Sequence, residues 1–104
     1  MIYGDCATGK VWFGGKEVDP GKSLRLENKS PSGFSWGYHG SGPAQLALAI
    51  LLEVTDESAA LMLYQEFKSD IIANQDVSQD LKLPVATVVT WLRQQCLEKR
   101  RCYE

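Results

Sequence analysis

The residues with the clearest chemical potential lie in one short glycine-rich stretch, residues 37–42. This stretch holds the only histidine of the chain, His39, two positions before Ser41. A histidine can activate a serine nucleophile only when the two side chains are hydrogen-bonded and an acidic group orients the histidine. Sequence neighbours do not guarantee that geometry, and the Gly-x-Ser-x-Gly spacing of hydrolases is absent because glycines flank Ser41 directly. The sequence therefore favours a protein without enzymatic activity, and a small enzyme is the third choice.

The same glycines precede a predicted helix start, which raises the alternative of a nucleotide or other anion held at the helix N-terminus. Free amide hydrogens in the first helical turn attract phosphate and carboxylate groups. Against this, Pro43 lacks an amide hydrogen, and no lysine follows the glycines as a phosphate-binding loop requires. Gln45 stands where a dinucleotide-binding loop would carry its third glycine. A sequestered small anion is thus the second choice, and we expect neither a cofactor nor a metal.

Recognition of a protein partner is the function that the sequence favours most. Tyrosine and tryptophan beside flexible glycines are typical of binding hot spots, because they give large contact area at low entropic cost. Phe34 and Trp36 are better explained as core residues, whereas Tyr38 and His39 lie nearer the predicted loop tip. No basic groove accompanies the rings, so nucleic acid is not an expected partner. The predicted contact surface consists of Tyr38, His39, Gly40, Ser41, Gly42 and Gln45.

A nearly uniform apolar helix must position these residues. From Pro43 to Leu52 the only polar side chain is Gln45, and a helix that is apolar on all sides must be covered on every face. Serine or glycine at the cap, followed by a proline in the first turn, predicts that the helix starts between Ser41 and Pro43. We expect this helix to be the centre of the fold.

The N-terminal part of the chain has the pattern of short strands. Residues 10–13 and 16–18 flank two glycines and predict a hairpin. Residues 19–22 predict a turn, and the alternation in residues 23–27 predicts a strand with Leu24 and Leu26 facing inward. Aromatic residues at every second position of residues 34–38 would share one face if this segment is extended.

Two further helices are expected after the central one. Thr55 or Asp56 should cap the second helix, and Pro84 should open the third. Residues 74–82 are expected to form a loop anchored by Leu81 and Leu83. The buried stripes should comprise Ala60, Leu63, Tyr64, Phe67 and Ile71, widened by Leu61, Ile72 and Ala73, and then Val85, Val88, Val89, Leu92 and Cys96, with Trp91 beside them. The sequence thus predicts an α+β fold, in which a small antiparallel sheet of N-terminal strands packs on a C-terminal three-helix layer with a central buried helix.

Length, charge and cysteine content set the remaining expectations. The 104 residues suit a single domain, residues 1–104, and the net charge of −2 gives no general attraction to nucleic acid. No apolar run is long enough to span a membrane. Three cysteines without metal-binding spacing favour reduced thiols and a cytoplasmic location, with a disulfide between Cys6 and Cys96 as the alternative. The basic end of the chain (Arg93, Lys99, Arg100 and Arg101) should complement a helix dipole, and exposed apolar surface on the third helix could support a homodimer.

Residues 30–51 resemble an uncharacterised small-domain family of bacteria, phages and mobile elements. The shared signature runs Ser-Pro-x-Gly-Phe-x-Trp-Gly-Tyr-x-Gly-Ser-Gly-Pro-Ala-Gln-Leu-Ala-x-Ala-x-Leu, and a later Tyr-x-x-Phe-Lys is met by Tyr64, Phe67 and Lys68. Members often carry glycine where this chain has His39 and an acid where it has Ser35, so the resemblance gives neither residue a role. It implies no activity. It does imply a phage or mobile-element setting and a shared site where the loop meets the helix.

Overall fold

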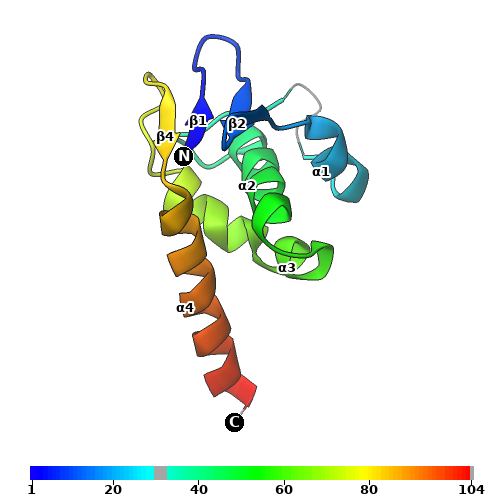
Figure 1. Cartoon of the computed structure of the whole chain (residues 1–104). Helices are drawn as coiled ribbons and strands as arrows, with labels where there is room; N and C mark the ends of the chain where they lie inside the picture. Colours follow the sequence, from blue (N-terminus) through cyan, green and yellow to red (C-terminus); the bar gives the residue numbers. More distant parts are fainter. Residues whose placement is uncertain (30–32, 104) are drawn as a thin grey trace.

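The fold is built around helix α2 (Ser41–Val54), as Figure 1 shows. The structure is a computed structural model that describes residues 1–29 and 33–103, with side chains described up to residue 95. In this part of the chain, a four-stranded antiparallel sheet and four α-helices form the α+β fold that the sequence predicts. None of these helices combines the length and the hydropathy that crossing a bilayer requires.

The sheet has the strand order β3-β2-β1-β4. Strands β1 (Ile2–Gly4), β2 (Val11–Phe13) and β3 (Lys16–Glu17) come from the N-terminal part, and the hairpin around Gly14 and Gly15 is confirmed. Strand β4 (Leu81–Leu83) corrects the prediction of a loop over residues 74–82, because Leu81 and Leu83 pair antiparallel with β1. Such a short strand is fixed by its distant partner and has too few residues to show alternation in sequence.

A short helix, α1 (Pro20–Leu26), replaces the predicted turn and strand. The Asp19 side chain accepts a hydrogen bond from the Gly21 amide, and Pro20 occupies the first turn, so the residues interpreted as a turn form a capped helix start. Leu24 and Leu26 are both half-buried, and Leu26 packs against the core from this helix.

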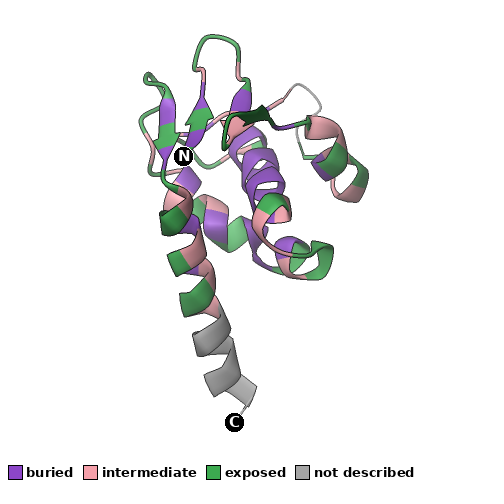
Figure 2. Ribbon diagram, in the orientation of Figure 1, coloured by how far each residue is buried: buried purple, intermediate pink, exposed green. Residues whose placement is uncertain are grey.

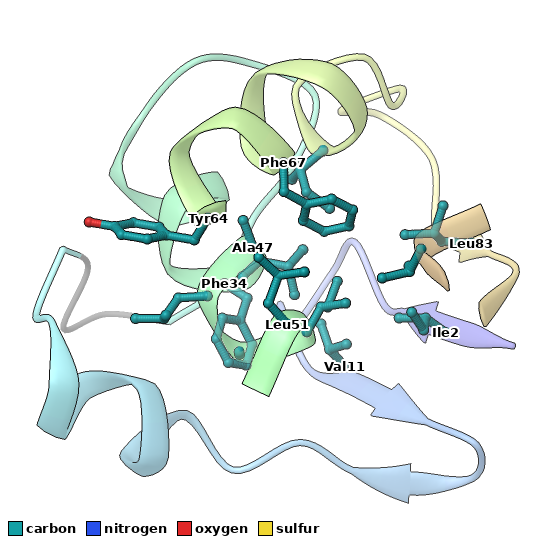
Figure 3. Close-up of a cluster of buried hydrophobic side chains, with 14 of the residues drawn as sticks. Ile2, Val11, Phe34, Ala47, Leu51, Tyr64, Phe67 and Leu83 are labelled. Atoms are coloured by element: carbon teal, nitrogen blue, oxygen red, sulfur yellow. The ribbon is translucent and has the colours of Figure 1, made fainter. Parts of the chain in front are cut away.

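Helix α2 is enclosed as predicted. Every residue from Gly42 to Leu51 is buried, and Figure 2 shows the helix buried around its circumference. The sheet supplies Ile2, Val11 and Leu83, which Figure 3 shows on the side of the sheet that faces the helices. Helices α1 and α3 cover other faces of α2. Burial of each large side chain contributes about 1.5–3 kcal/mol, so this enclosure dominates stability.

Helix α3 (Glu57–Phe67) begins at Asp56, whose side chain accepts a hydrogen bond from the Ala59 amide, as one of the two predicted caps. It continues into a π-helical turn, η1 (Lys68–Ile72). A π-helical turn places residue i+5, and not i+4, on the same side as residue i. Ile72, five residues after Phe67, is therefore fully buried, and Ile71 lies at the edge of the core. Leu61 is 39% exposed, which corrects its placement in the buried stripe.

Helix α4 (Val85–Tyr103) follows directly after Pro84 and extends away from the body of the molecule. Trp91, expected beside the stripe, is buried, and its ring meets Phe67 edge-on with centroids 5.1 Å apart. Its indole Nε1 donates a hydrogen bond to Asp70 Oδ2 at 2.8 Å and so ties α4 to η1. The predictions for Cys96 and for the basic residues at positions 99–101 lie outside the described side chains.

Residues 33–36 and the bends at 37–40 do not form a strand, which corrects the prediction of an extended aromatic face. Phe34 and Trp36 are both buried, as expected for core residues, whereas Tyr38 is 45% exposed. The positive φ of 85° at Gly37 turns the chain between Trp36 and Tyr38, and their rings therefore do not share one face.

Candidate functional site

Three loops meet beside the first turn of α2, and we call their residues 5–10, 33–40 and 74–80 together the loop end. The first loop joins β1 to β2 and the third leads into β4, so both lie at the same end of the sheet, at the top of Figure 1. The second loop leads into α2 and contains the predicted residues Tyr38, His39 and Gly40.

Trp36 ties the second loop to strand β1 and to the third loop. Its ring lies against Gly4, where an added Cβ atom would come within 2.7 Å of the ring atom Cη2. Its indole Nε1 donates a hydrogen bond to the backbone oxygen of Gln79 at 3.0 Å. The first loop meets the second at Gly9, where an added Cβ atom would lie 3.0 Å from the backbone oxygen of Phe34. Trp36 thus holds the second loop against β1 and the third loop, while the Phe34 backbone brings the second loop close to the first.

Gly37 makes the closest approach between two of these loops. A Cβ atom built on it would lie 2.5 Å from the backbone nitrogen and 2.7 Å from the Cα atom of Val77. The Gly37 amide also donates to the backbone oxygen of Ile72 at 3.0 Å. Because this residue has no side chain, Val77 can rest on the loop backbone, and the Val77 side chain remains 58% exposed.

Tyr38 lies over the beginning of α2. Its hydroxyl and that of Ser35 are 2.8 Å apart and share a hydrogen bond. A Cβ atom added at Gly42 would overlap Ser35 Oγ, and one added at Gly40 would lie 2.5 Å from the Tyr38 ring. The two glycines therefore let the Ser35 and Tyr38 side chains rest directly on the first helical turn.

This arrangement weighs against the alternative of an anion at the helix N-terminus. The Ser35 and Tyr38 hydroxyls lie against Gly42, where an anion would have to approach the first turn. Pro43, which lacks an amide hydrogen, is fully buried beside it. An anion could reach the helix start only after this hydroxyl pair had moved.

The six predicted contact residues separate into two groups. Tyr38, His39 and Ser41 are exposed and Gly40 is half-buried, so these four reach solvent together. Gly42 and Gln45 are both buried, and they cannot belong to a surface that a partner touches. No hydrogen bond joins His39 to Ser41 among the described contacts, so the structure does not place this pair in a catalytic arrangement.

Gln45 connects α2 to α1. Its Oε1 accepts from the Lys29 amide at 2.8 Å, and its Nε2 donates to Ser23 Oγ at 2.8 Å and to the Glu27 backbone oxygen at 3.0 Å. Ser23 is itself fully buried and donates to the Pro20 backbone oxygen. The only polar side chain between Pro43 and Leu52 thus satisfies backbone groups at and just after the end of α1.

Asp80 organises the first and third loops, a role the sequence did not reveal. Its carboxylate accepts from the Cys6 amide at 2.9 Å and from the Tyr3 hydroxyl at 2.7 Å, and these hydrogen bonds lower the pKa of Asp80. The same carboxylate raises the pKa of the Cys6 thiol, first by hydrogen bonding and then, with Asp5, by charge repulsion. Cys6 is an exposed free thiol that this environment keeps protonated.

The loop end carries little that could hold a cofactor or metal. A cavity of about 110 Å³ lies among Cys6, Phe34, Trp36 and Val77, well below the ~300 Å³ at which small-molecule pockets begin. Within the described residues, no three His, Cys, Asp or Glu side chains are grouped as a metal site requires. Val77, which sequence reasoning missed, could have been noticed as the one apolar residue among the polar residues 74–80.

Replacing Gln45 with methionine should destabilise the protein by about 2–4 kcal/mol, because the Lys29 amide and the Glu27 carbonyl lose a buried partner. The free energy of unfolding in urea, measured by circular dichroism, tests this. Gln65→Met on the exposed side of α3 is the matched control and should change stability by less than about 0.5 kcal/mol. Equal effects at the two positions would refute a structural role for Gln45.

Gly37→Ala should cost about 1–3 kcal/mol more than Gly33→Ala. Both glycines have positive φ angles, but only Gly37 faces an obstruction, since nothing lies within 4 Å of a Cβ atom added at Gly33. Denaturant unfolding of the two variants isolates the contact with Val77. Similar losses would mean that only backbone strain matters and that the two loops are not held together here.

The Cys6 thiol should be alkylated with an apparent pKa above its ordinary value of 9.0, and Asp80→Asn should lower that pKa. The measurement is the pH dependence of the iodoacetamide rate in a Cys96→Ser, Cys102→Ser background, which leaves one thiol. Asp76→Asn, on the same loop, serves as the control. A rate profile unaffected by the Asp80 substitution would contradict the proposed influence of that carboxylate.

Comparison with known proteins adds a family but no activity. A family model described as "Family of unknown function (DUF6166)" matches residues 3–94. No curated protein and no solved structure matches the chain. The matched segment includes the sheet except Ile2, together with α2, α3 and all three loops of the loop end. Since the match extends over far more than half of the sequence, the chain belongs to this family of unknown function, DUF6166.

Proposed function

We propose that this protein is a small non-enzymatic binding module that contacts a protein partner through the loop end. The observation that supports this most directly is the exposure of two apolar side chains on adjacent loops, Tyr38 at 45% and Val77 at 58%. Val77 rests on Gly37, the residue immediately before Tyr38. Solvent-facing aromatic and aliphatic groups on a fixed base lose little entropy when a partner covers them.

The surroundings of these two residues suggest the character of the partner. His39 and Ser41 are exposed beside Tyr38 and offer polar contacts at the edge. Asp76 and Asp80 lie on the same loop as Val77, and hydrogen bonds to each lower its pKa, so both carry negative charge at neutral pH. A complementary partner would present an apolar pocket with lysine or arginine at its rim.

The cellular setting belongs to the same proposal. The exposed free thiol of Cys6 suits a reducing compartment, which supports a cytoplasmic location. The resemblance at residues 30–51 supports a phage or mobile-element origin, so the partner would be a host protein or one encoded by the element. The glycine-rich loop then acts by shaping the surface, since its glycines allow the contacts at Val77 and at the start of α2.

Site-specific photocrosslinking in a host lysate tests this proposal. A benzoyl-phenylalanine residue would be introduced at position 38 or 77, and at Met62 as the control, because Met62 is equally apolar and 64% exposed on α3. We expect one protein to be captured reproducibly from positions 38 and 77 and not from position 62. Val77→Asp should reduce capture from position 38 by at least about tenfold while the circular dichroism spectrum stays unchanged.

Two results would overturn the proposal. Equal capture from all three positions would mean that the loop end has no special affinity. Saturable binding of a mono-, di- or cyclic nucleotide in a calorimetric titration, abolished by Gly42→Val in a protein that remains folded, would favour an anion site at the start of α2 instead.

A further inference from the structure

The sheet has a second face, away from the helices, on which one side chain from each strand contributes to a row. Ile2, Val11 and Leu83 occupy the inner face and are buried in the core. Because successive side chains of a strand point to opposite faces, Tyr3, Trp12 and Lys82 point outward. Glu17 pairs with Trp12, Trp12 with Tyr3, and Tyr3 with Lys82. We call this set, in the order Glu17, Trp12, Tyr3, Lys82 across the sheet, the outer row.

The outer row is aromatic in the middle and oppositely charged at its two ends. The Tyr3 and Trp12 rings lie with centroids 6.0 Å apart on the two central strands. Tyr3 is 38% exposed and Trp12 half-buried, while Glu17 and Lys82 are exposed. In the described part of the chain, Lys29 and Glu27 form the only side-chain ion pair, so Glu17 and Lys82 form no salt bridge there.

We propose that the outer row is a self-association surface that binds the outer row of a second copy of this chain. A two-fold axis parallel to the strands, running between Tyr3 and Trp12, superimposes the row on itself in reverse order. Each Glu17 then faces Lys82 of the other copy, and each Trp12 faces Tyr3 of the other copy. The row is therefore complementary to itself, which is the requirement of an isologous interface.

The charges around the row disfavour nucleic acid as its occupant. An aromatic pair on the central strands of a sheet could in principle stack nucleic-acid bases. Here the Asp80 carboxylate is hydrogen-bonded to the Tyr3 hydroxyl, and Asp5 is close enough to raise the pKa of that hydroxyl. These carboxylates would repel a phosphate backbone. A second copy of the chain, which presents Glu17 and Lys82 in reversed order, avoids this repulsion.

The symmetry also fixes where the loop ends of the two copies lie. An axis parallel to the strands leaves the direction along the strands unchanged, so the β1–β2 loops and the loops before β4 emerge on the same side of the pair. If the proposed function holds, the pair presents two partner-binding surfaces side by side, which increases apparent affinity for a repeated target. The self-association does not depend on that function.

The sheet is small, and the interface should accordingly be weak. Its strands have two or three residues each, so the contact falls below the size of standard stable interfaces. We therefore expect a dissociation constant between about 10 µM and 1 mM. Association should weaken as salt is added, because the charge pairs lie at the rim.

Charge reversal with rescue tests the pairing directly. Sedimentation equilibrium would compare the full chain with Lys82→Glu, with Glu17→Lys and with the double variant. Each single reversal places like charges opposite one another twice, and should weaken self-association about tenfold or more. The double reversal restores both pairs and should return association to the original level. A mixture of the two single variants should form a heterodimer in which all four charges are matched.

Two controls distinguish this interface from nonspecific association and from unfolding. Met62→Glu, on the exposed side of α3, should leave association unchanged, and circular dichroism should show that every variant is folded. The proposal is overturned if the protein remains a monomer at millimolar concentration. It is also overturned if single reversals have no effect, if the double variant is not rescued, or if the outer row instead binds a fluorescent single-stranded oligonucleotide in a monomer.

Discussion

The need to cover α2 on every side governs the architecture. A helix with apolar residues around its whole circumference is stable in water only inside a protein, and this one has a different neighbour on each side. The sheet lies against one face, α1 against another and α3 against a third. Burial of Gly42 through Leu51 removes the helix from solvent along most of its length. The strands have two or three residues each and α1 has seven, too few to be stable alone, so these elements gain stability chiefly by packing around this helix.

The candidate surface is a consequence of the same requirement. The start of a buried helix must also be covered, and here the cover consists of the Ser35 and Tyr38 side chains lying on two glycines. At those two glycines, and at Gly37 beneath Val77, neighbouring groups lie directly against the backbone because no side chain stands between them. The loop end is therefore a rigid cover whose outward groups are free to contact something else. Its glycines shape the surface by allowing these close contacts.

Sequence reasoning succeeded where local patterns decide the structure. The uniform apolar run of α2 and the Asp56 cap of α3 have signals within a few residues, and both predictions are confirmed. It failed for α1, because Asp19 and Pro20 begin turns and helices alike and seven residues show too little periodicity to separate the two. Strand β4 was missed because its pairing with β1 lies almost a whole chain away.

The candidate site was predictable only in part, for a related reason. Exposure of Tyr38 and His39 follows from their place near a loop tip, and the sequence indicated it. The predicted contact surface includes Gln45 because this residue lies near the helix start that follows the glycines. In the structure its side chain contacts the Ser23 hydroxyl and backbone groups of residues 27 and 29, which no residue type in the sequence reveals. Val77 joins the site through a contact between two distant loops, and that too is invisible without coordinates.

The pairing of the first strand with the last one has a consequence for the order in which the protein can fold. During synthesis the apolar segment that becomes α2 leaves the ribosome well before Leu81–Leu83, so the sheet that covers one of its faces is completed only later. Pairing β1 with β4 closes a loop that includes most of the chain, and the entropic cost of this closure slows folding. The nascent chain should therefore depend on chaperones more than its modest length suggests, and fragments truncated before β4 should aggregate.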